Sequence, residues 1–326
     1  GFSGVSIDSR RISDDEFFVA IKGANHDGHH FGKDVVRHGV RGLMVHREWP
    51  SRAVIDDWKE KGIVCVTVED TTRALGDTAA FHRQRSDASI VAITGSNGKT
   101  TTRSMTASVV SRRHKTLSTK GNRNNEIGLP LTLLCLSPQH RWAVVEMGMN
   151  HPGEIDRLAE ICAPDIGVIT NVGPAHLEGV GSIEGVMRAK GEILNRIVSG
   201  GKALLNGDDA RVMEIAGTWT GQKILFGLSK NAAIRARNIS HHGKNVSFTL
   251  VLPEETVPVH LPVPGNFMVP NALAAAAVGH CLGLSAREIK TGLENFKPVN
   301  GRMQLIALAD DMHLIDDTYN ANPGSM

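Results

Sequence analysis

Short apolar runs alternate with amphipathic stretches along most of this 326-residue chain. From residue 89 onward the runs are rich in β-branched residues, and segments with a helical period separate them. The runs that we expect to form strands lie at 89–94, 142–146, 166–170, 202–205 and 223–226. Strands that alternate with helices are typical of a parallel sheet covered by helices on both faces. The pattern therefore predicts a central α/β domain.

The residues before this region have a similar but smaller pattern. Strand candidates lie at 17–21, 42–45 and 63–68, and a helical pattern follows at about 71–85 with Asp70 or Thr71 as its N-cap. The polar stretch from Arg83 to Asp87 is a boundary candidate. We expect a small α/β domain over residues 1–86.

The pattern changes again toward the end of the chain. Residues 233–263 have a period of two, which predicts antiparallel strands added to the central sheet, and 271–279 and 285–295 have the period of helices. After Pro298, strand patterns return at 303–308 and 312–316. We therefore expect the central, mostly parallel sheet domain to cover residues 87–298, and residues 299–326 to be the first strands of a truncated C-terminal α/β domain.

Composition narrows the class of protein. Hydrophobic residues make up 41% of the chain and charged residues 21%, which is typical of a globular protein. A net charge of +2 gives no reason to expect a nucleic-acid or membrane-surface partner. No apolar run reaches membrane-spanning length and no signal peptide is evident, so we expect a cytoplasmic protein, trimmed at its N-terminus. The four scattered cysteines, which we expect to be buried free thiols, are Cys65, Cys135, Cys162 and Cys281.

The segment that carries the strongest chemical signal follows the strand at 89–94. It reads Thr-Gly-Ser-Asn-Gly-Lys-Thr-Thr over 94–101, a glycine-flanked turn that opens a helix. Backbone N–H groups at such a turn bind phosphate, while Lys99 would reach the terminal phosphates and Thr100 would bind magnesium. The usual loop is G-x-x-x-x-G-K-[ST], and Ile93 stands in place of its first glycine. A plain strand-to-helix turn is the alternative.

Polar side chains follow two further strands of the predicted sheet. Glu146 ends the strand at 142–146, and Asn171 and His176 follow the strand at 166–170. Ligands of parallel sheets bind beyond the carboxyl ends of the strands, where Thr100 also lies. A hydroxyl, a carboxylate and an imidazole suit a divalent cation beside ATP phosphates. Taken singly, Glu146 is equally a solvated loop residue and His176 a structural histidine.

Lys190 lies within an apolar helical stripe instead of on its polar face. The stripe contains Ile183, Val186, Met187, Ile193, Leu194 and Ile197. A buried ammonium is costly unless it is paired or loses its charge. Either the stem covers apolar surface while the head reaches water, or the lysine points at the metal site, as a salt bridge or as a carbamate.

Three other loops are ambiguous between turns and ligand contacts. Residues 121–130 contain Asn122, Asn124 and Asn125 between glycines, and ordinary turn propensity explains them equally well. Residues 8–10 and 25–31 combine an arginine, hydroxyl and carboxylate groups and an aromatic ring, which suit a diphosphate and a base but also a surface loop.

Taken together, these segments resemble the Mur ligases, the ATP-dependent amide-bond ligases of peptidoglycan precursor synthesis. The matching segments are 94–101, 121–130, 146–155, 171–179, 189–193, 271–276, 301–303 and 316–323. They follow the family order across nearly the whole chain. The asparagine-rich loop, Glu-Met-Gly-Met-Asn-His at 146–151 and Tyr-Asn-Ala-Asn-Pro at 319–323 are most similar to the type that joins D-alanyl-D-alanine to UDP-N-acetylmuramoyl-tripeptide.

The resemblance implies roles for individual residues. Those that would bind ATP are Gly95, Ser96, Asn97, Gly98, Lys99, Thr100 and Thr101 in the loop, Asn271 at adenine, and Arg302 and Asp317 near ribose and phosphate. The catalytic set would be Lys99, Glu146, His176 and Lys190. Of two magnesium ions, one would be held by Thr100 and Glu146 and the other by His176 and carbamylated Lys190. The UDP end would lie at Asp8, Ser9, Arg10, Asp27, Gly28 and Phe31. The remaining substrate contacts would be Asn122, Asn124, Asn125, Tyr319 and Asn320.

The resemblance also implies a reaction through an acyl phosphate in the cytoplasm of a bacterium. We expect a monomer. Two alternatives stay open: a ligase of the type that adds the third peptide residue, and a nucleotide-binding module without turnover. The family's C-terminal domain is present only as its first strands, so we expect this chain alone to bind the UDP-linked substrate and to ligate poorly.

Overall fold

The computed structural model describes residues 1–307 and 312–319, and these divide into two compact units. The first unit contains Gly1–Ser86 and Glu126–Leu136, and the second contains Asp87–Asn125 and the described residues from Ser137 onward. Residues 126–136, which the hydrophobic pattern assigned to the central domain, pack with the first unit here.

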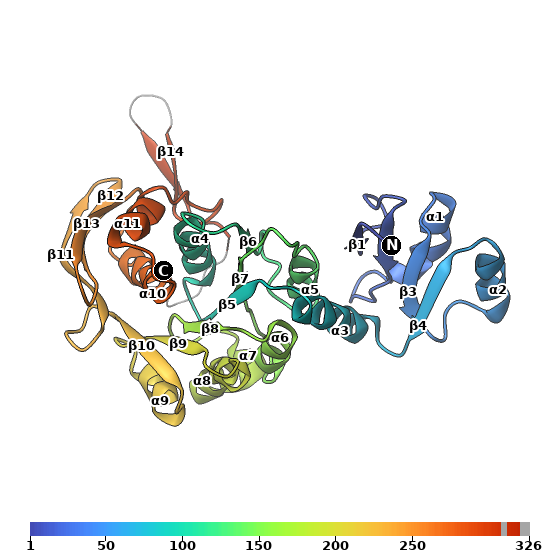
Figure 1. Cartoon of the computed structure of the whole chain (residues 1–326), viewed down its shortest axis with the longest axis horizontal. Helices are drawn as coiled ribbons and strands as arrows, with labels where there is room; N and C mark the ends of the chain where they lie inside the picture. Colours follow the sequence, from blue (N-terminus) through green and yellow to red (C-terminus); the bar gives the residue numbers. More distant parts are fainter. Residues whose placement is uncertain (308–311, 320–326) are drawn as a thin grey trace. The chain divides into compact units, whose positions relative to one another are not determined.

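The first unit is built on a four-stranded parallel sheet with the order β1-β2-β3-β4 (Figure 1). Its strands are β1 (Gly4–Ser6), β2 (Glu16–Val19), β3 (Gly42–His46) and β4 (Val64–Val68). Its helices are η1 (Gly28–Phe31), α1 (Gly32–Arg37), α2 (Arg52–Glu60), α3 (Thr71–Gln84) and α5 (Gly128–Leu133). The Asp70 carboxylate accepts hydrogen bonds from the backbone N–H groups of Thr72 and Arg73, so the expected N-cap of α3 is confirmed.

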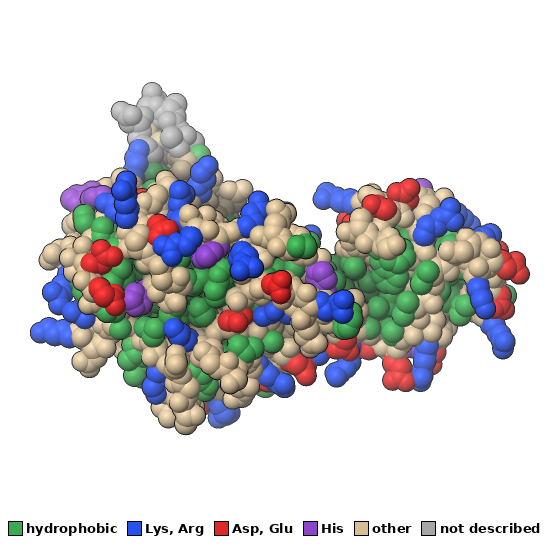
Figure 2. All heavy atoms as spheres, viewed as in Figure 1, with side chains coloured by type: hydrophobic (Ala, Val, Ile, Leu, Met, Phe, Trp, Pro, Cys, Tyr) green, Lys and Arg blue, Asp and Glu red, His purple; other side chains and the backbone are tan. Residues whose placement is uncertain are grey.

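Two hydrophobic clusters stabilise this unit. Phe18, Leu43 and Trp58 belong to one, and Met44 and Leu75 to the other. The edge strand β4 has neighbours on one side alone, and its Val64 and Val66 remain exposed. Figure 2 shows hydrophobic side chains on the surface of this unit. A parallel sheet is usually covered on both faces, so this face of β4 is covered less than is usual.

The second unit contains a nine-stranded sheet with the order β13-β12-β11-β10-β9-β8-β5-β7-β6. Its strands are β5 (Ser89–Thr94), β6 (Thr116–Ser118), β7 (Trp142–Glu146), β8 (Ile166–Ile169), β9 (Lys202–Asn206), β10 (Gln222–Gly227), β11 (Ile234–His242), β12 (Asn245–Val251) and β13 (Thr256–Leu261). Pairing is parallel from β6 to β11 and antiparallel from β11 to β13, as the sequence predicts. Since β5 lies between β7 and β8, its carboxyl end faces a change of strand order, where α/β sheets bind ligands.

Helices cover both faces of this sheet. Figure 1 shows α4, α10 and α11 together on one side and α6, α8 and α9 on the other. The helices are α4 (Lys99–Val110), α6 (Glu154–Cys162), α7 (Leu177–Val180), α8 (Ile183–Gly191), η2 (Glu192–Arg196), α9 (Ala210–Thr218), α10 (Met268–Cys281) and α11 (Ala286–Glu294). The last strands are β14 (Gln304–Ala307) and β15 (His313–Asp316), an antiparallel pair.

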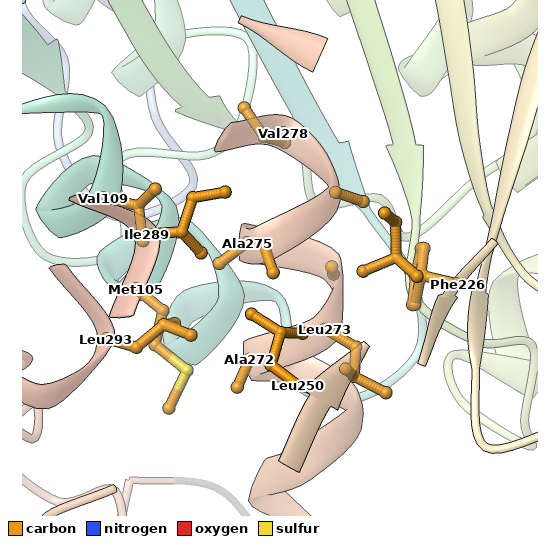
Figure 3. Packing of buried hydrophobic residues seen from close by; sticks show 14 of the residues in the cluster. Met105, Val109, Phe226, Leu250, Ala272, Leu273, Ala275, Val278, Ile289 and Leu293 are labelled. Carbon is orange, nitrogen blue, oxygen red and sulfur yellow. The ribbon is translucent and has the colours of Figure 1, made fainter. Parts of the chain in front are cut away.

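The main core fixes the position of the helix that follows the phosphate loop. Met105 and Val109 of α4 pack against α10 and α11 (Figure 3). A Cβ on Gly292 would lie 2.5 Å from Val109 Cα, so α11 approaches α4 too closely for any larger residue. The small side chains of the alanines on α10 allow a similarly close approach. This helix is apolar on all sides, as is typical of a helix that is buried throughout.

Two expectations need correction. The apolar stripe at 183–197 is not one helix, because α8 changes to the 3-10 helix η2 at Glu192. None of the four cysteines forms a disulfide, but Cys135 is exposed and Cys65 and Cys281 are half-buried, so only Cys162 is buried as expected. Among the described residues, no helix is long and apolar enough to span a bilayer.

Candidate active site

The phosphate loop joins β5 to α4, and the segment after β8 holds its backbone. Asn97 N–H donates to Asn171 Oδ1 at 2.8 Å, and Asn171 Nδ2 donates back to the Asn97 carbonyl at 3.0 Å. Ser96 Oγ donates to the Gly173 carbonyl and accepts from Gly173 N–H, both at 2.9 Å. Asn171 therefore lies at the edge of the sheet where the sequence places it, and it supports the loop.

Glycine is required at both ends of the turn. Gly98 has φ +77°, and a Cβ there would lie 2.3 Å from Asn271 Oδ1. Gly95 has φ +151°, and a Cβ there would lie 1.9 Å from Thr170 Oγ1. A residue with a side chain would be strained at either position and would also collide with its neighbour. The shorter glycine spacing therefore belongs to a loop packed closely against β8 and α10.

Lys99 is the first residue of α4 and folds back over the loop. Its Nζ donates to the carbonyls of Gly95 at 2.8 Å and Ser96 at 3.1 Å. Burial lowers the pKa of Lys99, the negative charge of Glu146 opposes that shift, and the charge of Arg302 adds to it. The ammonium thus has neutral carbonyl partners, and an anionic phosphate would be a stronger hydrogen-bond acceptor for it.

Glu146 ends β7 with a side chain that is 2% exposed. Its backbone N–H donates to Thr119 Oγ1 at 3.1 Å, and its Oε1 accepts from Asn124 Nδ2 at 2.8 Å. Its Oε2 is buried without a hydrogen-bond partner among the described residues. Arg103 Nε lies 3.7 Å from that oxygen. The carboxylate is therefore fixed through one oxygen while the other keeps its lone pairs.

His176 and Lys190 complete a group of basic side chains. Burial lowers the pKa of His176, and the charges of Lys99 and Lys190 lower it further. Lys190 is 1% exposed, and burial together with the charge of Lys99 lowers its pKa well below the usual value. Its head does not reach water, so the interpretation in which the ammonium is solvated is wrong, and a role at the metal site stays a prediction.

Electrostatics couples these candidates to Lys99. The charge of Glu146 opposes the lowering of the Lys99 pKa, the charge of Lys99 contributes to the lowered pKa values of His176 and Lys190, and Thr100 is the next residue of the helix. The described residues contain no group of three or more His, Cys, Asp or Glu that could hold a metal ion by themselves. A magnesium ion here would therefore use a few protein ligands together with phosphate oxygens and water, as Mg²⁺ commonly does.

Asn124 takes part in this group, whereas the sequence placed it toward the substrate. Its side-chain amide donates to Glu146, and its backbone carbonyl accepts from Gly148 N–H at 2.8 Å. Asn122 and Asn125 lie on the exposed part of the same loop. A substrate role for the three asparagines stays a prediction.

The residues expected around the nucleoside fall into two places. Asn271 is 9% exposed, and its Oδ1 accepts from Thr102 Oγ1 at 3.1 Å, so its side chain packs on the phosphate loop. The Arg302 guanidinium lies 4.0 Å from the centre of the Tyr319 ring, and Asp317 Oδ1 accepts from Met303 N–H at 3.1 Å. Asn320 lies outside the described residues.

In the first unit, the expected UDP contacts bond within their own segments. Arg10 donates to both Asp8 carboxylate oxygens, at 2.9 and 3.0 Å, and these hydrogen bonds lower the pKa of Asp8 to about 2. Asp27 Oδ1 accepts from His29 N–H at 3.0 Å and caps η1. Phe31 is exposed, whereas a Cβ on Gly28 would lie 2.8 Å from the backbone of Ile21. Ser9 is half-buried.

Sequence reasoning missed residues that support the site without reaching its surface. Thr119 and Thr170 bond to the Glu146 backbone and to the loop, and nothing in their local pattern distinguishes them from strand-end threonines. Arg103 had a usable signal, since it lies four residues after Lys99 and therefore on the same face of α4.

Comparison with known proteins gives the same family over both units. The Mur ligase middle domain matches residues 93–279, and the Mur ligase family catalytic domain matches residues 1–83. The UDP-N-acetylmuramoyl-tripeptide–D-alanyl-D-alanine ligase of Escherichia coli K12 is 40% identical over 99% of this chain and 70% of its own length. The ligase of the same name from Bacillus subtilis is 33% identical, with 99% of this chain and 68% of that protein covered.

Solved structures agree. MurF from Acinetobacter baumannii has a TM-score of 0.90 at 38% identity, and 99% of this chain and 69% of that chain are covered. MurF ligase from Thermotoga maritima in complex with ADP has a TM-score of 0.87 at 26% identity, covering 99% of this chain and 72% of that one. The chain thus spans about 70% of the length of these relatives.

Proposed function

The chain belongs to the Mur ligase family, and from that membership we propose that it catalyses the ATP-dependent joining of D-alanyl-D-alanine to UDP-N-acetylmuramoyl-tripeptide. The observation that carries this proposal is the match of ligases with that name over 99% of the chain. A ligase of this type is ADP-forming, and a related structure contains ADP.

The proposed reaction has two steps. The substrate carboxylate attacks the γ-phosphorus of ATP, so that an acyl phosphate forms and ADP leaves. The amine of D-alanyl-D-alanine then attacks the acyl carbon, a tetrahedral intermediate expels phosphate, and the amine loses a proton as the amide forms. Positioning and charge neutralisation suffice for such a phosphoryl transfer, and no covalent protein nucleophile is needed.

We assign binding of the γ-phosphate of ATP to Lys99. Its Nζ already lies over the loop, where the Gly95 and Ser96 carbonyls accept its hydrogen bonds. Exchange of these neutral acceptors for phosphate oxygens strengthens the interaction, because a full negative charge attracts the ammonium more strongly than a carbonyl dipole does. Ser96 N–H and Asn97 N–H already donate to Asn171, so the backbone N–H groups at the N-terminus of α4 would bind the same phosphates.

The donor set fits two magnesium ions beside the nucleotide. Thr100 and Glu146 would hold one ion, and Glu146 Oε2 is suited to it because this buried oxygen has no hydrogen-bond partner among the described residues. His176 and Lys190 would hold the other if Lys190 is carbamylated, since carbamylation converts a buried amine into an anionic oxygen ligand. The low pKa of Lys190 favours the neutral amine that reacts with carbon dioxide. Bound magnesium would neutralise charge on the phosphates.

The remaining roles follow the resemblance. Asn271, Arg302 and Asp317 would contact the nucleoside, and the segments 8–10 and 27–31 would contact the UDP end. The asparagine loop at 122–125 and Tyr319 and Asn320 would lie toward the peptide and the incoming amine. A monomeric state and a cytoplasmic location also stay predictions.

The choice of UDP-linked peptide tests which type of Mur ligase this chain is. The full-length protein is supplied with ATP and either the UDP-linked tripeptide plus D-alanyl-D-alanine, or the corresponding dipeptide plus D-alanyl-D-alanine or a diamino acid, and phosphate release is measured. We expect release with the tripeptide alone. Release with the dipeptide and a diamino acid instead would assign the chain to the ligase type that adds the third residue.

Two variants separate turnover from folding. Lys99→Met should lower kcat by at least a hundredfold, while Lys230→Met, which removes an exposed lysine from the same unit, should leave it unchanged. The mass of the intact protein should include one added carbon dioxide that is lost in Lys190→Met. Binding of ADP without any release of phosphate by the full-length protein would favour the binding-module alternative.

A further inference from the structure

Arg103 is a buried cation beside the site to which the family roles above give no function. It lies four residues after Lys99 on α4 and is 7% exposed. Four residues correspond to about 6 Å along a helix, so Arg103 lies roughly one turn deeper than the lysine that covers the loop. Arg103 is therefore farther from the phosphate loop than Lys99.

The anion that Arg103 faces is Glu146. Arg103 Nε lies 3.7 Å from Glu146 Oε2, and neither atom has a hydrogen-bond partner among the described residues. Burial lowers the pKa of Arg103, and the charge of Glu146 opposes that shift. A buried guanidinium without an anion is strongly unfavourable, so the two groups are held near each other by charge.

Three contacts together position Glu146, one at its backbone and two at its carboxylate. Thr119 accepts from the Glu146 backbone N–H, Asn124 donates to Oε1, and the charge of Arg103 attracts Oε2. The contact with Arg103 differs from the hydrogen bond with Asn124. At 3.7 Å between Nε and Oε2 it is too long for a hydrogen bond, so it orients the oxygen by charge without using a lone pair. Oε2 is thus directed and still able to bind a cation.

We propose that Arg103 is a positioning residue that holds Glu146 Oε2 in the orientation required by the divalent cation bound with the nucleotide. This inference rests on the proposed function for the identity of the cation and for the role of Glu146. Partners of metal-ligating carboxylates behave in this way, and their loss typically weakens metal binding 10- to 100-fold.

Nucleotide binding with and without the cation tests the proposal. The dissociation constant of ADP is measured by calorimetry for the full-length protein in EDTA and in saturating MgCl₂. In Arg103→Met, we expect the tightening of ADP binding by Mg²⁺ to be about tenfold smaller than in the wild type, in line with the effect of such partners. The dissociation constant in EDTA should stay within about twofold, because Arg103 does not contact the phosphates in this assignment.

Two further variants control for folding and for charge. Arg113→Met removes another arginine–glutamate pair, from the turn that follows the same helix, and it should leave both constants unchanged. Arg103→Lys keeps a buried cation and should recover part of the Mg²⁺ effect, which keeps the test decisive if Arg103→Met does not fold. Melting temperatures verify the folded state of each variant.

Several outcomes would overturn the proposal. Equal weakening of ADP binding in EDTA and in MgCl₂ would make Arg103 a direct nucleotide contact. An unchanged or larger Mg²⁺ effect in Arg103→Met would make it a structural residue or a competitor of the cation. Absence of any Mg²⁺ effect in the wild type would remove its basis. None of these measurements requires ligation, so a protein that does not join the proposed substrates fails the proposed function separately.

Discussion

At the scale of single residues, Gly98 is where backbone conformation and packing act together. It has φ +77°, and a Cβ would lie 2.3 Å from Asn271 Oδ1. A left-handed conformation costs a residue with a side chain about 1–2 kcal/mol, and overpacking adds about 1–3 kcal/mol. We predict that Gly98→Ala lowers the free energy of unfolding of the second unit by about 2–5 kcal/mol, measured by urea denaturation.

Gly200→Ala is the matched control for that change. Gly200 has φ +80° and nothing lies within 4 Å of its Cβ position, so this variant carries the backbone strain without the collision. We expect it to cost about 1–2 kcal/mol. Equal costs at the two positions would contradict a close approach between the phosphate loop and Asn271.

Residues of the site differ in how far the sequence could predict them. Lys190 was evident because an ammonium within an apolar stripe is an exception that burial makes costly, and its side chain is 1% exposed. The partnership of Asn124 with Glu146 was not evident, since it joins residues 22 positions apart through a loop whose composition equally suits a turn. Periodicity reports which face a residue occupies but not which side chain it meets.

At the scale of secondary structure, the hydrophobic pattern predicted strands of four or more residues and missed the two that have only three. The expected strands from 89 to 226 and the antiparallel strands over 233–263 are present. β1 and β6 have three residues each, too few for a period to be recognised. The break between α8 and η2 was also missed, because 3.0 and 3.6 residues per turn are indistinguishable over five residues.

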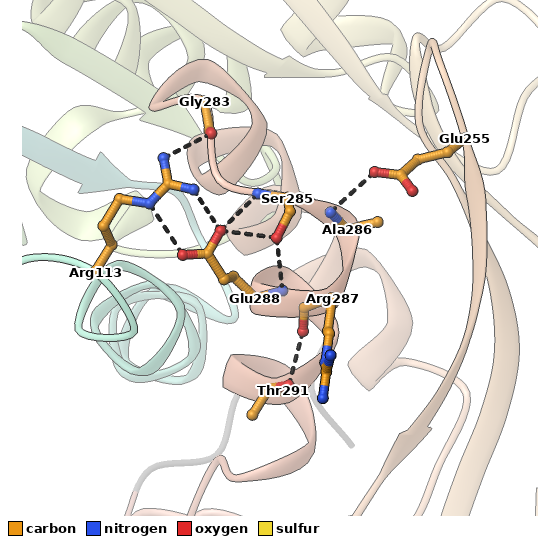
Figure 4. Close-up of polar contacts among 8 residues, drawn as sticks. All are labelled: Arg113, Glu255, Gly283, Ser285, Ala286, Arg287, Glu288 and Thr291. Carbon is orange, nitrogen blue, oxygen red and sulfur yellow. Dashed lines mark hydrogen bonds and ion pairs between the residues drawn. The ribbon is translucent and has the colours of Figure 1, made fainter.

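The N-terminus of α11 provides an electrostatic test at this scale. Arg113, just after α4, donates to both Glu288 carboxylate oxygens, and Glu288 also forms a capping box with Ser285 (Figure 4). Hydrogen bonds from Arg113, and after them from the backbone and hydroxyl of Ser285, lower the pKa of Glu288 to about 2 from 4.5. A carboxylate whose pKa is lowered in the folded state stabilises that state at pH values above its pKa in the unfolded state.

We predict that Glu288→Gln lowers the free energy of unfolding by about 0.2–1 kcal/mol at pH 7, as for other solvent-accessible ion pairs. The effect should diminish as the pH falls from 4.5 toward about 2, where the folded wild type also becomes protonated. Glutamine retains the capping box, so the charge is the main change. Urea denaturation across this range measures it, with exposed Glu214→Gln on α9 as the control. A difference that persisted at low pH would exclude the ion pair as its cause.

At the scale of the whole molecule, the chain consists of two compact units that are proposed to bind different substrates of the reaction, ATP in one and the UDP-linked peptide in the other. The phosphate loop, Glu146, His176 and Lys190 all belong to the second unit, and the expected UDP contacts belong to the first. The sequence predicted a boundary at 86–87 from polar composition, but it could not predict that residues 126–136 return to the first unit. Their contacts with α3 are long-range and leave no local signal.

Separate ligands should therefore stabilise separate units, which hydrogen exchange measured by mass spectrometry can resolve. ADP with Mg²⁺ at 100 times its dissociation constant should add about 2.7 kcal/mol to the free energy of opening where the bound segments open together. We predict slower exchange in peptides covering 95–101 and 170–176, and no change in peptides from residues 1–86. UDP should instead slow exchange around residues 8–10 and 27–31. Protection by UDP confined to the second unit would place the uridine diphosphate site elsewhere than the resemblance implies, while leaving the phosphate loop assignment intact.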